Sequence, residues 1–153
     1  MLAKNREDFQ KIHDILVSYQ EADGRVISGP FVKLPTRKEL PDYYQVITKP
    51  MDLWRIEKNI HEDRYKNMEA FENDVKLMCA NAQEYNMEGS MIYQDSEVLS
   101  MVFKECKRQL ANGEKDIFIE PGQFTMGPPT YVPPPDEDGD DEEGTSDEDD
   151  DSS

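Results

Sequence analysis

The apolar residues near the start of the chain recur with the spacing of one helical face. They are Phe9, Ile12, Leu16 and Tyr19. Intervals of three and four residues match the 3.6-residue turn of an α-helix. Gly24 is a natural end for such a helix. The pattern therefore predicts an amphipathic helix that begins near Phe9 and ends before residue 24.

Three further segments repeat this helical periodicity. A short stripe over residues 53–60 follows Asp52, a candidate N-cap. Longer stripes with alternating spacings of three and four residues occupy residues 67–86 and 92–110, with a glycine and serine turn between them. Together with the first helix, these segments predict an all-α four-helix bundle whose last two helices are antiparallel.

A proline-rich stretch separates the first predicted helix from the second. Residues 25–51 contain four prolines, which are too close together for a helix or a central strand. The apolar and aromatic residues of this stretch include Phe31, Leu34, Leu40, Tyr43 and Tyr44. A disordered linker does not need so many such groups. We therefore predict a long, packed loop, and ordered loops of this length are usually functional.

The negative charge of the chain is concentrated at its end. The sequence has 34 acidic and 17 basic residues, a net charge of -17, and residues 136–153 hold 12 of the acids and no base. The remaining 22 acids and 17 bases leave residues 1–135 with a net charge of -5. This balance favours basic partners, makes contact with DNA weak at most and argues against a membrane surface. We expect a folded domain over 1–115, a Pro-rich linker over 116–135 and a disordered acidic tail over 136–153.

The sequence shows no pattern typical of catalysis or metal binding. Cys79 and Cys106 are too few for a disulfide framework, and His13 and His61 lie far from both. Gly139 cannot occupy the glycine position of a calcium-binding loop without placing wrong residues at the ligand positions. A nucleophile paired with a base and a phosphate-binding loop are also missing. We expect a monomeric domain that is not an enzyme and has no cofactor and no metal.

Four separated segments carry a family resemblance. They are GPFVKLP at 29–35, LPDYY at 40–44, KPMDL at 49–53 and NAQEYN at 81–86. In this order and on these elements they resemble a bromodomain over residues 9–110, whereas any one of them alone is a weak signal. The segments RKELP at 37–41 and EGSMIY at 88–93 are most similar to the bromodomains of SWI/SNF-type chromatin-remodelling ATPases, with polybromo-type domains as the near rival.

The resemblance implies a left-handed four-helix bundle that binds acetylated lysine. It implies that the side-chain amide of Asn86 donates to the acetyl carbonyl and that Tyr43 contacts the same carbonyl through a water. The other implied site residues are Phe31, Leu34 and Leu40 on the loop side, Ala82, Tyr85 and Ile92 on the helix side, and Pro30 at the rim. Gly29 stands where many members have a tryptophan, which implies a wider mouth.

Three of these residues also have purely structural interpretations. Asn86 suits a left-handed helix C-cap, Tyr43 suits ordinary loop packing, and Ile92 suits core packing. Residue chemistry agrees with the binding interpretation, since acetylation replaces an ammonium by a carbonyl and a methyl, which fit a neutral donor in an apolar slot. The ammonium of unmodified lysine would lose its water there without a matching acceptor.

We therefore expect a reader of acetylated histone tails that acts in the nucleus beside other subunits of a chromatin-remodelling complex. Two alternatives remain. One is an acidic histone-binding protein whose bundle is a scaffold, and the other is a bundle that contacts DNA through basic loop residues. The PPTY sequence at 128–131 also fits the PPxY ligand of WW domains, against a linker that lies along the bundle.

Overall fold

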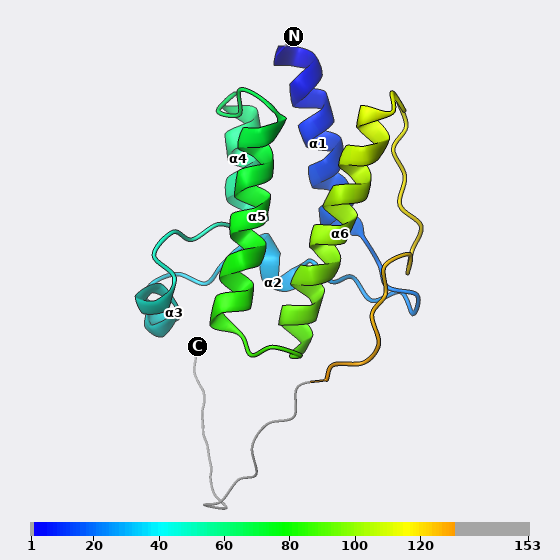
Figure 1. Cartoon of the computed structure of the whole chain (residues 1–153). Coiled ribbons are helices and arrows are strands. Elements are labelled where there is room, and N and C mark those ends of the chain that lie inside the picture. Colours follow the sequence, from blue (N-terminus) through cyan, green and yellow to red (C-terminus); the bar gives the residue numbers. More distant parts are fainter. Residues whose placement is uncertain (1, 131–153) are drawn as a thin grey trace, which may run out of the picture.

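The computed structural model describes residues 2–130, and this part of the chain folds into helices without a strand. The helices are α1 (Leu2–Ser18), α2 (Gly29–Val32), α3 (Pro41–Val46), α4 (Leu53–His61), α5 (Met68–Tyr85) and α6 (Met91–Ala111). The four long helices α1, α4, α5 and α6 form a bundle, and α2 and α3 lie in the connection from α1 to α4 (Figure 1). The predicted all-α four-helix bundle is confirmed. The predicted acidic tail lies outside the described residues.

Three of the bundle helices begin at a side-chain N-cap. Asp52 caps α4 and Asn67 caps α5, each accepting a hydrogen bond of 2.8 Å from the backbone N–H three residues further on. Ser90 caps α6 in the same way at 3.3 Å. These bonds satisfy N–H groups that have no partner inside the helix. The helix starts predicted at Asp52 and Asn67 are therefore confirmed.

The predicted apolar stripes meet in the core. Leu16 of α1, Ile56 of α4, Phe71 of α5 and Leu99 of α6 are all fully buried. Phe71 stacks on Phe9 of α1, with ring centroids 4.7 Å apart. Burial of one such side chain contributes about 1.5–3 kcal/mol to folding, so the stripes hold the bundle together.

The first helix starts earlier than the apolar stripe predicts. It begins at Leu2, whereas the stripe begins at Phe9, and it ends at Ser18, before Gly24. Residues 4–8 of its additional turns are all polar or charged, and Arg6 there forms an ion pair of 2.7 Å with Asp63. A polar helical extension leaves no apolar periodicity, which is why the pattern misses it.

The predicted long loop contains two short helices. Pro30 and Pro41 lie in the first turns of α2 and α3, where the missing N–H of proline has no intrahelical partner to lose. The prediction that prolines exclude helix from this stretch is wrong for these two segments. The loop is packed as expected, since Phe31 and Tyr43 are buried.

Buried polar side chains fasten this loop to the bundle. Asp52 is fully buried and accepts a hydrogen bond of 2.8 Å from the backbone N–H of Leu34, in addition to capping α4. The side-chain amide of Asn81 on α5 donates to the carbonyl of Lys49 at 2.7 Å. The hydroxyl of Ser28 donates to a carbonyl of α1. Because an unpaired buried polar group is costly, these bonds fix the path of the loop.

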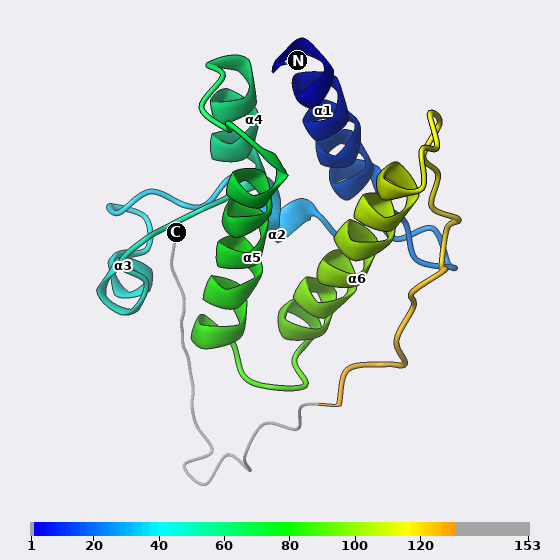
Figure 2. The same ribbon diagram turned by 45° about the horizontal axis from the view of Figure 1, so that its top comes forward.

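Residues 116–130 lie along the bundle beside α6 (Figures 1 and 2). The backbone N–H of Phe124 donates to the hydroxyl of Tyr19 at 2.9 Å. At the other end of the segment, the N–H of Thr130 donates to the carbonyl of Gly89, between α5 and α6, at 2.8 Å. The first three residues of the PPTY sequence belong to this docked segment, and the fourth lies outside the described residues.

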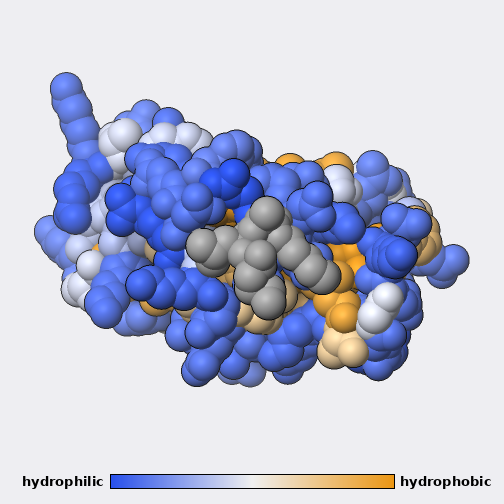
Figure 3. All heavy atoms as spheres, turned by 90° about the horizontal axis from the view of Figure 1, so that it is seen from above, coloured by the Kyte–Doolittle hydropathy of each residue, from blue (hydrophilic) through white to orange (hydrophobic). Residues whose placement is uncertain are grey.

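Cys79 and Cys106 are buried free thiols, and burial raises their pKa values to about 11 and about 12. Within residues 2–130, acidic, histidine and cysteine side chains form no cluster suited to a metal ion. In the same part of the chain, no helix is long and apolar enough to span a membrane. Figure 3 views the end of the bundle opposite the α5–α6 turn, where mainly hydrophilic residues cover the surface.

Candidate functional site

A cavity of about 230 Å³ lies where α5 turns into α6. The end of α5 and the start of α6 form one wall, and the loop that contains α2 and α3 forms the other (Figures 1 and 2). We call this cavity the slot. Its lining residues are Pro30, Phe31, Lys33, Leu34, Pro35, Leu40, Tyr43, Met51, Met78, Ala82, Tyr85, Asn86 and Ile92. Since most of these are apolar or aromatic, the slot suits a small, largely apolar group.

The slot brings together all nine site residues that the family resemblance implies. They are Phe31, Leu34, Leu40 and Tyr43 from the loop, Ala82, Tyr85 and Asn86 from α5 and its end, Ile92 from α6, and Pro30. Pro30 is exposed, as a rim residue must be. Ile92 also packs against the core, so it contacts both the core and the slot.

Four further residues line the slot that sequence patterns do not predict. They are Lys33, Pro35, Met51 and Met78. Met78 is buried in the core, as expected from its stripe, and it reaches the slot because it lies one helical turn before Ala82. Lys33 and Pro35 flank Leu34 in the loop. For Lys33 and Pro35, the signal in the sequence is their position in the same loop segment as Leu34 and not an apolar pattern.

The backbone of Asn86 ends α5 in an extended conformation. Its φ is −105° and its ψ is 154°, so Asn86 is the C-cap of α5 but does not adopt the left-handed conformation. The side-chain Nδ2 donates to the carbonyl of Ala82 at 2.9 Å, which fixes the orientation of the amide. A side-chain amide carries two N–H groups, and the second has no acceptor within the described part of the chain. This N–H is available to a carbonyl in the slot.

Tyr43 presents a neutral hydroxyl from the loop side. The residue is 6% exposed, and its ring packs edge-on against Tyr85, with centroids 4.8 Å apart. Burial, together with neighbouring Tyr44, raises the pKa of Tyr43 to about 12. The neighbouring Tyr44 donates its hydroxyl to the carbonyl of Pro35. Tyr44 therefore braces the loop, whereas Tyr43 lines the slot and its hydroxyl remains protonated near neutral pH.

The electrostatics of the slot disfavour a cation. None of its lining residues is acidic, and Lys33 is the charged member of the lining. The Nζ of Lys33 lies 4.6 Å from the ring centroid of Trp54, a residue that does not line the slot. A second cation would lose water in the slot without gaining a carboxylate. The chemistry of the lining suits a neutral group better than a cation.

The mouth of the slot is open beside Gly29. A Cβ added at Gly29 would meet no atom within 4 Å, and the adjacent Pro30 is exposed. A bulky side chain at this place would extend the wall of the slot outward. Gly29 itself does not line the slot, and the wider mouth that glycine at this position implies stays a prediction.

A family model described as Bromodomain matches residues 14–98 of this chain. These are 85 of the 153 residues, which is more than half of the chain. Among solved structures, the bromodomain from human BAZ1A superimposes with a TM-score of 0.60 and 29% sequence identity, covering 67% of this chain and 94% of that chain. The resemblance found in the sequence is confirmed.

Curated relatives include chromatin-remodelling proteins. The ATP-dependent helicase brm of Drosophila melanogaster is 37% identical over 107 residues, which are 70% of this chain and 6% of that protein. The SWI/SNF chromatin-remodeling complex subunit snf22 of Schizosaccharomyces pombe is 39% identical over 100 residues, 65% of this chain and 6% of that protein. The chromatin structure-remodeling complex subunit rsc4 of the same organism is 37% identical over 93 residues, 61% and 17% respectively. This chain spans less than a fifth of the length of each.

Proposed function

This chain belongs to the bromodomain family, and on that premise we propose that its slot binds acetylated lysine in histone tails. A bromodomain is a reader module and not a catalytic one, as expected from the sequence. The observation that carries the proposal is the amide of Asn86, which presents a neutral donor inside an apolar slot. An acetylated lysine has the matching chemistry, namely a carbonyl acceptor and a methyl group on an apolar stem.

In this proposal each slot residue has a distinct role. The second N–H of the Asn86 amide donates to the acetyl carbonyl, and the Tyr43 hydroxyl donates to the same oxygen through a water. Phe31, Met78 and Ala82 enclose the methyl group, while the wall at Ile92 contacts the alkyl stem. Lys33 repels the ammonium of an unmodified lysine. Selectivity then follows from the cost of bringing a cation into a slot without a carboxylate.

The names of the relatives support a proposal about the cellular context of this binding. Their names describe an ATP-dependent helicase and subunits of chromatin-remodelling complexes. We propose that this protein likewise acts in the nucleus as part of a chromatin-remodelling assembly, in contact with other subunits. Its bromodomain would hold that assembly on acetylated nucleosomes, and any contact of the domain with DNA would be weak beside this.

Titration of paired histone peptides tests the proposed function. The full chain is titrated with peptides that differ only in acetylation of one lysine, across an array of histone sites. We expect acetylated peptides to bind at least about tenfold more tightly, because a desolvated ammonium without a partner costs well over the 1.4 kcal/mol that a tenfold change represents. An acidic histone-binding protein would show the reverse order, since it prefers the more cationic peptide. That outcome would overturn the proposal.

Replacing Tyr43 by phenylalanine should weaken acetyl-lysine binding modestly. The change removes a water-mediated hydrogen bond worth about 1 kcal/mol, or about fivefold in affinity, while the ring still packs against Tyr85. Tyr44→Phe is the matched control, because its hydroxyl bonds within the loop and does not line the slot. Tyr44→Phe should lower the melting temperature and leave the affinity for acetylated peptide nearly unchanged. Unchanged affinity in Tyr43→Phe would reduce Tyr43 to a packing residue.

A further inference from the structure

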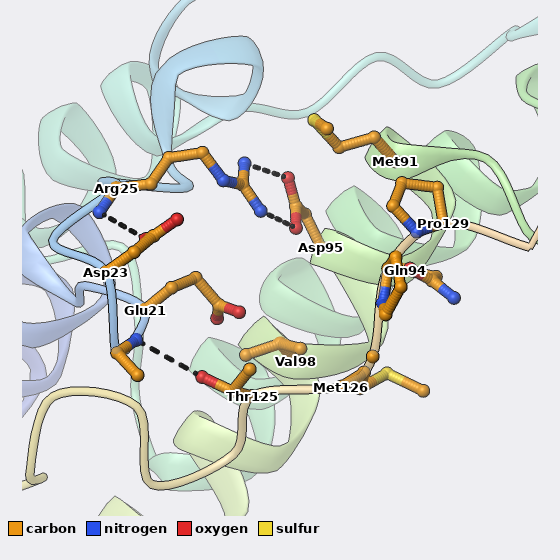
Figure 4. Close-up of a pocket in the computed structure, with 13 residues that line it drawn as sticks. Glu21, Asp23, Arg25, Met91, Gln94, Asp95, Val98, Thr125, Met126 and Pro129 are labelled. Carbon is orange, nitrogen blue, oxygen red and sulfur yellow. Dashed lines mark hydrogen bonds and ion pairs between the residues drawn. The ribbon is translucent and has the colours of Figure 1, made fainter.

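A second cavity, of about 430 Å³, lies against a different face of α6 (Figure 4). Its walls are the turn after α1, the first two turns of α6 and the docked residues 125–129. Met91, Gln94, Asp95 and Val98 contribute the α6 wall, and their spacing places them on one helical face. The slot uses Ile92 of the same helix. We call this second cavity the acidic pocket.

The charges that line the acidic pocket sum to −2. The three acids are Glu21, Asp23 and Asp95, and the one base is Arg25. Arg25 is engaged by Asp95 in a two-pronged ion pair, with Nη1 3.0 Å and Nη2 3.1 Å from the two carboxylate oxygens. The Oδ1 of Asp23 accepts from the backbone N–H of Arg25 at 2.9 Å. The guanidinium therefore neutralises Asp95 and leaves the pocket negative at Glu21 and Asp23.

Glu21 lacks a partner inside this pocket. The residue is 8% exposed, and its Oε2 is buried without a hydrogen-bond partner within the described part of the chain. Figure 4 shows its carboxylate pointing into the cavity, between Asp95 and Val98. Buried carboxylate oxygens are normally satisfied, because their desolvation is costly. An incoming cation would supply the missing hydrogen bond and a compensating charge.

Specific contacts build the outer wall of the pocket. The backbone N–H of Ala22 donates to the Oγ1 of Thr125 at 3.4 Å. Gly122 has a φ of +75°, and a Cβ there would lie 2.8 Å from the Cβ of Ala22, so only glycine allows this close approach. With Thr130 bonded to Gly89 at the other end, the segment is held against the pocket on both sides.

The lining of the acidic pocket suits a cation on an apolar stem. Met91, Val98, Met126 and two prolines provide apolar surface beside the carboxylate of Glu21. The carboxylates do not converge as metal ligands, since the described residues contain no such cluster. The chain's own residues 136–153 have the wrong charge, with 12 acids and no base. The side chain of lysine or arginine combines the required charge with the required stem.

We propose that the acidic pocket binds an unmodified lysine or arginine of the same peptide whose acetylated lysine occupies the slot. This inference rests on the proposed function of the slot. Met91 at the pocket and Ile92 at the slot are consecutive residues, so a peptide passes from one site to the other around the first turn of α6. A helix with side chains is about 10–12 Å across, and an extended peptide advances about 3.3 Å per residue. The basic residue therefore lies about three to five residues from the acetylated lysine.

A peptide series tests the acidic pocket. Each peptide carries one acetylated lysine and, at a scanned distance from it, lysine, arginine or uncharged norleucine. At the correct distance we expect lysine and arginine to raise the affinity about tenfold over norleucine, as for a hydrogen bond to a charged group. Glu21→Gln should remove this gain and leave the affinity for the norleucine peptide unchanged. The variant should fold normally, because the amide replaces a buried carboxylate that has no partner.

Glu114→Gln is the matched control for the overall field. It removes the same charge from an exposed residue just beyond the opposite end of α6, and it should keep the tenfold gain. The proposal is overturned if Glu21→Gln also keeps the gain, or if both variants lose it equally. The norleucine peptide reports the slot alone, so loss of acetyl dependence in that peptide refutes the proposed function, separately from the pocket.

Discussion

Asn86→Ala should abolish measurable binding of acetylated lysine while the domain stays folded. The substitution removes the amide that donates directly to the acetyl carbonyl and leaves that carbonyl only the water-mediated bond to Tyr43. Such a loss costs up to about 3 kcal/mol, or about a hundredfold in affinity. The fold should persist because Asn86 lies at the end of α5 and outside the apolar core. Calorimetric titration with an acetylated peptide, together with a thermal melt, measures both effects.

Two further variants make this result specific to the amide. Asn86→Asp keeps the shape of the side chain but replaces the donor by a carboxylate, so it should also lose acetyl-lysine binding. Asn112→Ala applies the same truncation to the exposed residue that ends α6, far along the bundle from the slot, and should bind normally. Full affinity in a cooperatively folded Asn86→Ala protein would refute the assignment of the slot.

The bundle is predictable from the sequence because its information is local. The stripes that contain Phe71 and Leu99 each repeat at helical spacing, and caps such as Asn67 mark where helices begin. The slot is predictable for a different reason. Apart from Met78 and Ile92, its residues come from the four separated motifs, and only the family resemblance indicates that these motifs meet. Spacing alone leaves Ile92 undecided between core and slot, and the structure gives it both contacts.

The acidic pocket has no comparable signal in the sequence. Its outer wall depends on contacts between Ala22 and residues 122–125, about a hundred positions further along the chain. Neither segment has periodicity that would predict the other as its neighbour. The sequence also does not indicate that Glu21 is buried, since an isolated glutamate in a turn is normally a solvated surface residue. Long-range packing of a segment without regular structure is therefore what sequence patterns miss here.

Asp52 joins the fold of this protein to its candidate site. Its buried carboxylate caps α4, accepts from the backbone N–H of Leu34 in the slot wall and pairs with Arg55. One side chain thus satisfies three donors from two parts of the chain. Loss of this carboxylate leaves the buried N–H of Leu34 and the α4 terminus without partners, and unpaired buried groups of this kind are costly.

Asp52→Ala should therefore lower both stability and acetyl-lysine affinity. We expect a loss of about 3 kcal/mol in the free energy of unfolding, which chemical denaturation measures. Affinity should fall as well, because Leu34 and its loop are no longer fastened to α4. Asn67→Ala is the matched control, since Asn67 caps α5 but bonds to no loop segment. Asn67→Ala should lower the free energy of unfolding by about 1 kcal/mol and leave the affinity for acetyl-lysine unchanged.

Asp52→Asn separates the cap from the fastening of the loop. Its amide oxygen still accepts from the α4 terminus, but its NH2 group cannot accept from the N–H of Leu34. This variant should keep most of the helix cap and still lose affinity, because the slot wall depends on the bond to Leu34. If Asp52→Asn binds acetylated peptide as tightly as the natural protein, the loop keeps its position without Asp52. The shape of the slot would then depend on the other contacts of the loop, such as the packing of Phe31 and Tyr43 and the bond from Asn81 to Lys49.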